Sequence, residues 1–262
     1  MLELITFEKL KPFSSLLHAT TRKSIHAPYN FSLALHTGEE KQSILRNRET
    51  LSSLLDDGNS FDYIVAEQTH GDHIEIITEH STKGWRTLED AVKNCDALIT
   101  NLKGVMLTIL TADCVPILLF DPQNEVVAAI HAGWRGTKSK IVAKTIAKMA
   151  ERFGSDPHNI IAGIGPSIGI CCYEVSKEVA IHFCDTPDAL LPKEDKYMLN
   201  LPLINQKQLL TMGVQKHNIE MSGLCTSCET TRFFSYRKEQ GCTGRFMSLI
   251  GMKQTQKEKH EN

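Results

Sequence analysis

Residues able to carry chemistry stand at both ends of an apolar hairpin pattern in residues 111–136, TADCVPILLFDPQNEVVAAIHAGWRG. Cys114 precedes the first apolar run, and His131 ends the second. If the letters DPQN form a four-residue hairpin loop, Phe120 faces Glu125 across the two strands and Cys114 faces His131. Directly facing residues have their β-carbons about 5 Å apart. We therefore expect this thiol and this imidazole to lie close enough to share one metal ion or one proton.

A second histidine, His70, lies in the sequence QTHGD between two stretches that are typical of strands. Two imidazoles and one thiolate, with water as the fourth ligand, form a tetrahedral zinc site of the catalytic type. His73 is the weaker candidate because it opens a strand and fits a hydrogen-bonding or solvent-exposed role. The same residues also fit a nucleophile, Cys114, with His131 as its base and no metal. The spacing in the sequence leaves both chemistries open.

Small and basic residues surround the ends of these strands. Gly133 and Gly136 allow the backbone to come close to a ligand, and Arg135 offers a planar group suited to phosphate. Arg237 and Arg245 lie among aromatic residues in FFSYRKEQGCTGRF, where they fit either a surface role or a contact to phosphate or ribose. The strand ends are therefore where we expect the site.

Two further motifs predict no site of their own. Cys225 and Cys228 form a CxxC motif, but a zinc ribbon needs a second pair, and the adjacent Cys171 and Cys172 have the wrong spacing. We therefore expect these cysteines to be packed locally. The glycine-rich segment 163–175 matches neither nucleotide-binding fingerprint, and its glycines are expected to form a tight loop near a pocket wall.

The elements that must position these residues follow from the apolar periodicity. Alternating or continuous apolar runs predict strands over 61–67, 73–78, 104–110, 115–120 and 125–131, with a return to strand within 235–252. Helical spacing predicts helices over 138–154, about 176–183 and 204–213, the first of them ending at Gly154. We expect one mixed α/β domain over residues 1–262, with a polar tail, 253–262, that frays.

Composition limits the classes of partner. The chain has 262 residues, 41% of them apolar, and its 29 Lys and Arg against 31 Asp and Glu give a net charge of −2, which argues against nucleic acid. It contains no long apolar run, and its start lacks the features of a signal peptide, so we expect a cytoplasmic protein with no membrane partner. In a reducing compartment, its eight cysteines are expected to be buried, metal-binding or catalytic rather than bridged.

The motifs together resemble the YfiH-like family, also described as laccase-domain, multicopper polyphenol oxidase or purine nucleoside phosphorylase. The resemblance covers about residues 44–250, and it rests on QTHGDHI, NCDALIT, LTADCVPILLFDP, AAIHAGWRGT, GIGPSIGICCYEV and FFSYRKEQGCTGR. It implies a layered α/β fold of mixed sheets with helices on the outside. It also implies a zinc site formed by His70, Cys114 and His131, with Cu²⁺ as the alternative metal.

The resemblance implies phosphorolysis of purine nucleosides (adenosine, inosine, methylthioadenosine), with adenosine deamination as an added activity. The partners would be a nucleoside and phosphate; the oligomeric state stays open. Asp113 is then the candidate for moving a proton, and Arg48, Arg135 and Arg237 are candidates for binding substrate or phosphate. Arg48 matches an Asn-Arg pair of the family, whereas segment 1–43 diverges from it.

Three alternatives compete with this interpretation. The first is a hydrolase or amidase with Cys114 as nucleophile, His131 as base and His70 orienting it. The second is a binding protein whose metal is structural and has four protein ligands. The third is a copper-dependent polyphenol oxidoreductase. A multicopper laccase in the strict sense is disfavoured because the eleven histidines include no His-x-His pairs.

Overall fold

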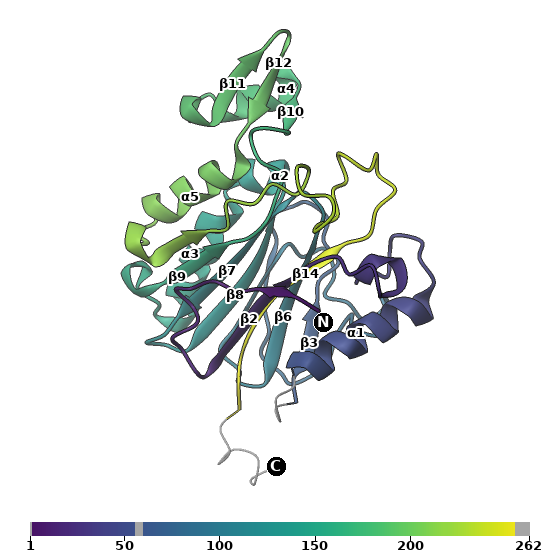
Figure 1. Cartoon of the computed structure of the whole chain (residues 1–262). Helices are drawn as coiled ribbons and strands as arrows, with labels where there is room; N and C mark the ends of the chain where they lie inside the picture. The colour runs from purple at the N-terminus through teal and green to yellow at the C-terminus, as the bar shows by residue number, and fades with distance from the viewer. Residues whose placement is uncertain (1, 56–59, 255–262) are drawn as a thin grey trace.

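Two stacked β-sheets form the centre of the molecule in the computed structural model, which describes residues 2–55 and 60–254 (Figure 1). One sheet contains, in spatial order, β1 (Leu4–Ile5), β2 (Leu16–Thr21), β14 (Phe246–Met252), β6 (Val105–Thr111) and β3 (Asp62–Val65). The other contains β13 (Ile219–Met221), β9 (Ile161–Ile164), β7 (Val115–Asp121), β8 (Val126–Ala132), β5 (Ala97–Thr100) and β4 (Ile74–Ile76). The five strands predicted between residues 61 and 131 are thus confirmed.

A smaller sheet extends from one end of this sandwich. It consists of β10 (Glu174–Val175), β12 (Lys196–Leu199) and β11 (Leu190–Lys193), at the top of Figure 1. It lies in the segment that connects β9 to helix α5 (Leu201–Thr211).

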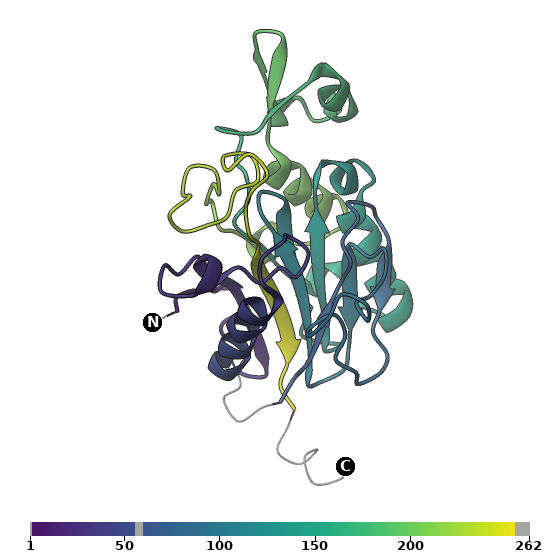
Figure 2. The same cartoon turned by 90° about the vertical axis from the view of Figure 1, so that its right-hand side faces the viewer.

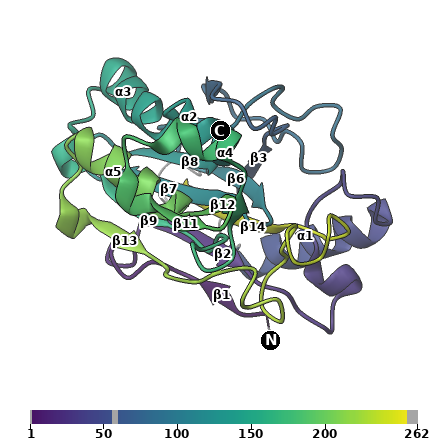
Figure 3. The same cartoon turned by 90° about the horizontal axis from the view of Figure 1, so that it is seen from above.

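Helices cover the outer faces of the sandwich (Figures 2 and 3). The helices are α1 (Lys41–Leu55), α2 (Trp134–Lys138), α3 (Ile141–Phe153), α4 (Lys177–Ala180) and α5 (Leu201–Thr211). Short 3₁₀ turns are η1 (Pro28–Phe31), η2 (Pro157–Asn159), η3 (Ile181–Phe183), η4 (Pro187–Ala189) and η5 (Lys216–Asn218). The predicted class, mixed sheets with helices outside, is confirmed.

Both faces of the central strands are buried, which explains their nearly continuous apolar sequences. Along β7, Leu118 and Phe120 pack into the core between the two sheets. The alternate residues Ile117 and Leu119 pack into the core that includes residues of α3 and α5. Helix α1 contributes Leu51 and Leu55 to a third core, on the outer face of the five-stranded sheet.

The register of the β7–β8 hairpin differs from the prediction. Pro116, not Cys114, pairs with His131, and Asp121 remains in the strand opposite Val126. The loop is shifted by one residue because the Asp121 carboxylate accepts hydrogen bonds from the backbone of Gln123 and Asn124, at 2.9 and 3.3 Å. The offset of two residues preserves the face of the strand, so Cys114 becomes a diagonal neighbour of His131.

Several boundaries also differ from the prediction. Only residues 246–252 of the expected strand 235–252 are extended in the sheet, and α5 begins at Leu201, where the Asn200 side chain caps its start. Helix α1 and strand β2 lie in or beside the segment 1–43, for which no element was predicted. The helix predicted over 138–154 spans Ile141–Phe153, and Gly154 stops it as predicted, in the left-handed conformation. Residues 255–262 of the expected frayed tail lie outside the described residues.

None of the helices within the described ranges is long and apolar enough to span a bilayer.

Arg48 of α1 has a role in the fold that the sequence did not indicate. Its side chain is fully buried, and its guanidinium donates to the carbonyls of Leu33, Gly84 and Trp85 at 2.6–2.9 Å. It joins α1 to the N-terminal segment and to the loop after β4. Four of the five N–H donors of this guanidinium are occupied by carbonyls and the side chain is closed to solvent, so the expected substrate contact of Arg48 does not fit this geometry.

Replacing Arg48 is expected to destabilise the fold rather than the chemistry. In Arg48→Ala, each carbonyl that loses its donor costs roughly 1–3 kcal/mol, so the free energy of unfolding should fall by about 3 kcal/mol or more. The matched control is Arg46→Ala, on the same helix but exposed, where about 0.5 kcal/mol or less is expected. Urea unfolding of both variants measures the difference, and equal stabilities would contradict this role.

Candidate functional site

Three potential metal ligands meet at one end of the stacked sheets. The ligand atoms of His70, Cys114 and His131 all lie within 4.8 Å of one another. His131 occupies the penultimate position of β8 and shares the face of Val127 and Ala129, which look into the space between the sheets. Cys114 directly precedes β7, and His70 comes from the loop between β3 and β4. The structure thus brings together the three residues that the sequence selected.

The loop that carries His70 is held by one buried carboxylate, that of Asp96. Its two oxygens accept hydrogen bonds from the backbone N–H groups of Thr69, His70 and Gly71, at 3.2, 3.0 and 2.7 Å. His70 itself adopts a φ of 62°, a left-handed conformation that a residue other than glycine holds only when its surroundings enforce it. Asp96 therefore shapes the turn that presents the His70 ring.

The same carboxylate orients His131. Nδ1 of the His131 ring lies 2.7 Å from Asp96 Oδ1, which leaves Nε2 as the ring atom available to a metal. The backbone N–H of His131 also donates to the Asp96 carbonyl at 2.8 Å. Carboxylate-supported histidines are common in metal sites, where the carboxylate fixes the tautomer.

Asp96 is the functional residue that sequence reasoning missed. The sequence signal for Asp96 was its place in NCDALIT, where a carboxylate directly precedes an apolar strand, β5. In the structure this carboxylate is fully buried. Burial pushes the pKa of Asp96 upward, but hydrogen bonds from His131, Gly71 and Thr69 and the charge of His131 bring it below its ordinary value. The group that orients His131 is thus Asp96, whereas the sequence suggested His70.

The thiol and the imidazole stabilise each other's charged forms. Burial raises the pKa of Cys114, but the charge of His131 and hydrogen bonds from His131 and His70 outweigh it and lower this pKa to about 6. Burial lowers the pKa of His131, but the charge of Cys114 and the hydrogen bond to Asp96 raise it to about 9. Between these values the pair is a thiolate and an imidazolium, which makes Cys114 ready to bind a metal or to attack an electrophile.

Gly133 keeps the space around the ligands open. A Cβ on this residue would lie 3.1 Å from Cys114 Sγ and 3.2 Å from the His70 ring, both tighter than ordinary contacts. A Cβ on Gly136 would lie 2.9 Å from the carbonyl of Gly71, in the loop that carries His70. The glycines of HAGWRG therefore let the chain after β8 approach the site closely.

The donor set fits a metal ion. Two imidazoles and a thiolate suit a divalent transition metal, and only three ligands are grouped here among the described residues, which leaves one coordination position for water or substrate. His70 is exposed and His131 buried, so the open side faces solvent. His73 is exposed and faces Glu75 at 3.4 Å, which agrees with its lower rank as a ligand.

Asp113 lies beside Cys114 but uses its carboxylate within the protein. Its two oxygens accept hydrogen bonds from the Thr226 hydroxyl and the Arg237 backbone N–H, each at 2.6 Å. It has a φ of 91° and is buried, and its carbonyl accepts from Ile168 at 2.9 Å. Asp113 therefore joins the loop that follows β13 to the start of β7.

Two arginines selected from the sequence lie exposed near this loop. The Arg135 guanidinium lies 4.5 Å from the Trp134 ring, and that of Arg237 lies 5.3 Å from the Tyr173 ring while donating to the Glu174 carbonyl. Burial raises the pKa of Tyr173. The charges of Cys114 and Asp113 also raise this pKa, whereas the charges of Arg237 and Arg135 lower it. Tyr173 therefore lies among the site residues, a role the sequence did not indicate.

The N-terminal segment also reaches the site. Burial and the charge of Arg245 lower the pKa of His36, and the charge of His70 acts in the same direction. Ser32 accepts a hydrogen bond from the backbone of Arg245 at 3.2 Å, which fixes the N-terminal segment against the loop before β14. The structure thus adds His36 to the surroundings of the metal ligands and places half-buried Arg245 there too.

The cysteines expected to be packed locally form a group instead. The sulfur atoms of Cys171, Cys172, Cys225 and Cys228 all lie within 4.8 Å of one another. The prediction of local packing is wrong because it considered spacing along the chain, whereas two loops distant in sequence meet here.

Comparison with known proteins agrees with this architecture. Residues 17–253 match a family model described as multi-copper polyphenol oxidoreductase laccase. The chain is 35% identical over 231 residues to the purine nucleoside phosphorylase YlmD of Bacillus subtilis (strain 168), covering 86% of this chain and 83% of that protein. It is 35% identical over 235 residues to the adenosine deaminase RL5 of an unknown prokaryotic organism, covering 84% and 87%. The crystal structure of the Bacillus licheniformis hypothetical protein YfiH is similar with a TM-score of 0.88 and 33% identity, covering 95% and 96%.

Removing the charge of Asp96 is expected to weaken metal binding without touching a ligand. Asp96→Asn keeps the size of the side chain but weakens its support of His131 and of the loop carrying His70, so metal affinity should fall about 10–100-fold. Competition with a chromophoric chelator measures this affinity. The control is Asp72→Asn, since Asp72 pairs with Lys144 on the surface near the same loop. Equal affinities of the two variants would contradict the role of Asp96.

The pKa of Cys114 predicts a pH profile for the chelator-treated protein. Because the thiolate is the reactive form, alkylation of Cys114 by iodoacetamide should rise with pH and reach half its maximum near pH 6. His131→Ala removes the neighbouring positive charge, so its profile should shift to higher pH. Peptide mapping by mass spectrometry measures Cys114 alone. A midpoint at about pH 8.5 in the unsubstituted protein would show that the pairing is absent.

Proposed function

This chain belongs to the family described as multi-copper polyphenol oxidoreductase laccase, as its motifs indicated, and on that basis we propose that it is a zinc-dependent purine nucleoside phosphorylase. The observation that carries the proposal is the three-ligand group of His70, Cys114 and His131, which is open to solvent and whose Cys114 interacts electrostatically with Arg245. The names of its relatives supply the substrate class, purine nucleosides with phosphate.

In this proposal His70, Cys114 and His131 hold Zn²⁺, and Asp96 orients His131 and the loop of His70. When bound there, zinc supplies a Lewis acid that stabilises negative charge and lowers the pKa of water. Cu²⁺ is the alternative metal. One group of three ligands, with no histidine cluster beside it among the described residues, supports a single-ion site over a multicopper one.

Phosphorolysis breaks the bond between the purine nitrogen and ribose C1, while a phosphate oxygen forms a new bond to C1. The purine leaves with the electron pair and takes up a proton. Arg135 and Arg237, both exposed, and half-buried Arg245 are proposed to bind the phosphate through charge-assisted hydrogen bonds. Because Arg48 is fully buried, it is left out of this set.

Adenosine deamination is proposed as a second activity of the same site, supported by the relative named adenosine deaminase. The sequence suggested Asp113 as the group that moves a proton. Since both of its oxygens already accept hydrogen bonds, we assign Asp113 a positioning role: it holds Thr226 and the backbone of Arg237 next to Cys114.

A metal-free hydrolase remains the second candidate because one observation favours it. Cys114, His131 and Asp96 form a chain of thiol, imidazole and carboxylate in which the pKa of Cys114 is lowered to about 6. Full activity toward an amide or ester after chelation would favour this candidate. Loss of activity with the metal, and its return with Zn²⁺, would favour the phosphorylase.

Incubation of metal-quantified protein with adenosine is the direct test. With phosphate, we expect adenine and ribose 1-phosphate, together with inosine from deamination and hypoxanthine from the phosphorolysis of inosine, whereas without phosphate only inosine should form. Liquid chromatography of the bases and nucleosides measures both. Cys114→Ala should lose its metal and at least 100-fold in rate, since it removes a ligand and leaves the others incomplete. Zinc-loaded protein that consumes no nucleoside would refute the substrate assignment.

The same assay tests the arginines. Arg135→Ala and Arg237→Ala should each raise KM for phosphate about tenfold, with a smaller effect on KM for adenosine. Arg152→Ala, an exposed arginine on α3 far from the ligands in sequence, is the matched control and should leave both constants unchanged. If KM for phosphate is unchanged in both Arg135→Ala and Arg237→Ala, these two arginines do not belong to the phosphate site.

A further inference from the structure

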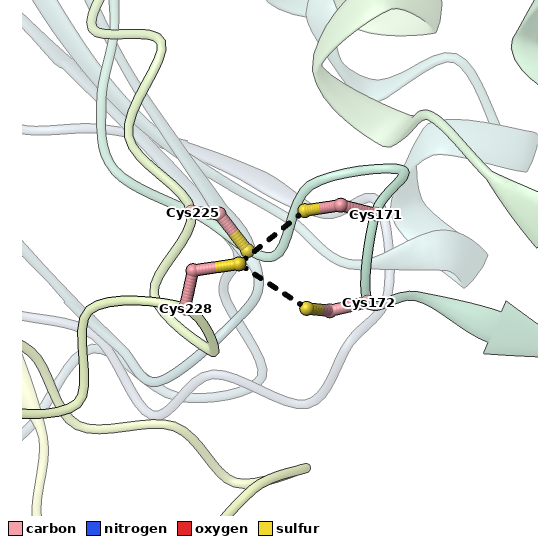
Figure 4. A group of neighbouring side chains, drawn as sticks. All are labelled: Cys171, Cys172, Cys225 and Cys228. Carbon is pink, nitrogen blue, oxygen red and sulfur yellow. Dashed lines mark hydrogen bonds between the residues drawn. The ribbon is translucent and has the colours of Figure 1, made fainter.

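A second group of potential metal ligands lies outside the site described so far (Figure 4). Cys171 and Cys172 come from the turn between β9 and β10, and Cys225 and Cys228 come from the loop after β13. In Figure 4 the sulfur atoms of Cys225 and Cys228 lie side by side and face those of Cys171 and Cys172, to which dashed lines join that of Cys228. The Sγ atom of Cys228 lies 3.6 Å from that of Cys171 and 3.4 Å from that of Cys172.

These distances match a tetrahedral thiolate site. A disulfide requires sulfur atoms about 2.05 Å apart, and all eight cysteines of the chain are free. Metal–sulfur bonds of about 2.3 Å place the four sulfurs of a tetrahedral site roughly 3.8 Å from one another. The observed spacing is therefore that of four ligands around one small ion.

The backbone around the group is arranged for sulfur. The Gly169 N–H donates to Cys225 Sγ at 3.2 Å, and a Cβ on Gly169 would lie 3.3 Å from Cys171 Sγ and 3.5 Å from Cys225 Sγ. Backbone bonds within each turn, from Cys172 to Gly169 and from Cys228 to Cys225, hold the ligands in place. The two turns are also joined, since Ser167 and Cys225 form a parallel bridge.

We propose that Cys171, Cys172, Cys225 and Cys228 form a second metal centre, which binds Zn²⁺ through four thiolates. Each zinc–sulfur bond forms as the thiol proton is released to solvent, so binding involves no oxidation or reduction. With all four positions filled by protein, this centre is structural, in contrast to the three-ligand site.

The position of the centre links it to the proposed active site. Thr226 lies between the ligands Cys225 and Cys228, and its hydroxyl binds Asp113, the neighbour of Cys114. Tyr173 follows Cys172 and supports the guanidinium of Arg237. Zinc at this centre would fix the two loops that carry these residues. The inference does not depend on the proposed activity, because its test measures metal and not product.

Metal content of single variants tests the second centre. Protein purified under reducing conditions with added zinc should contain two zinc ions per chain by mass spectrometry. Cys228→Ser and Cys172→Ser should each retain one, and Cys114→Ser should also retain one, held by the four cysteines. Cys184→Ser, an exposed free cysteine outside the group, is the control and should retain two.

Cobalt identifies which ligands hold the ion. Co²⁺ added to Cys114→Ser that has been freed of zinc by a chelator should give the intense absorption of tetrahedral cobalt thiolate, and the double variant Cys114→Ser, Cys228→Ser treated in the same way should lack it. Circular dichroism of Cys172→Ser and Cys228→Ser separates loss of the ion from loss of the fold. A single zinc that survives in Cys114→Ser and disappears in Cys228→Ser would support this centre while refuting the first.

Two results would overturn the proposal. The first is Cys114→Ser protein that is folded and binds neither zinc nor cobalt. The second is intact mass about 2 Da below that of the reduced chain, with Cys225 and Cys228 or Cys171 and Cys172 joined in a disulfide after purification without an oxidant.

Discussion

The buried carboxylate of Asp96 is the constraint on which the metal-ligand site depends. A charge removed from water must be compensated by hydrogen bonds, and Asp96 obtains them from the loop of His70 and from the His131 ring. The loop of His70 and the end of β8 are therefore held together by the same group. The left-handed conformation of His70 and the orientation of His131 both follow from this single requirement.

The stacked sheets supply the rigid frame for this arrangement. Alternation along β8 directs His131 into the space between the sheets. Cys114 lies on the same side because it is two residues from Pro116, which pairs with His131, and residues two apart in a strand share a face. The segments that cover the site come from both ends of the chain, since Ser32 binds Arg245 and Thr226 binds Asp113. Residues from the N-terminal part of the chain and from the loop between β13 and β14 therefore both lie at this end of the stacked sheets.

Two groups of ligands with different chemistry lie on connected loops. The group of His70, Cys114 and His131 has three donors and faces solvent, as suits chemistry on a substrate. The group of four cysteines supplies four thiol donors, the number that fills a tetrahedral coordination sphere around a structural ion. One hydrogen bond connects the two groups, because the Thr226 hydroxyl donates to Asp113. Asp113 is next to Cys114 in the sequence, and Thr226 is next to Cys225.

The sequence by itself determined the five strands predicted between residues 61 and 131, helix α3 and the three ligand residues, because alternation, helical period and ligand type are local properties. It also indicated the family. Only the tertiary structure decided the role of Asp96, the burial of Arg48 and the meeting of Cys171 with Cys228. Each of these depends on loops or elements distant in the chain that pack together, and a buried charge or thiol shows its partners only once that packing is known.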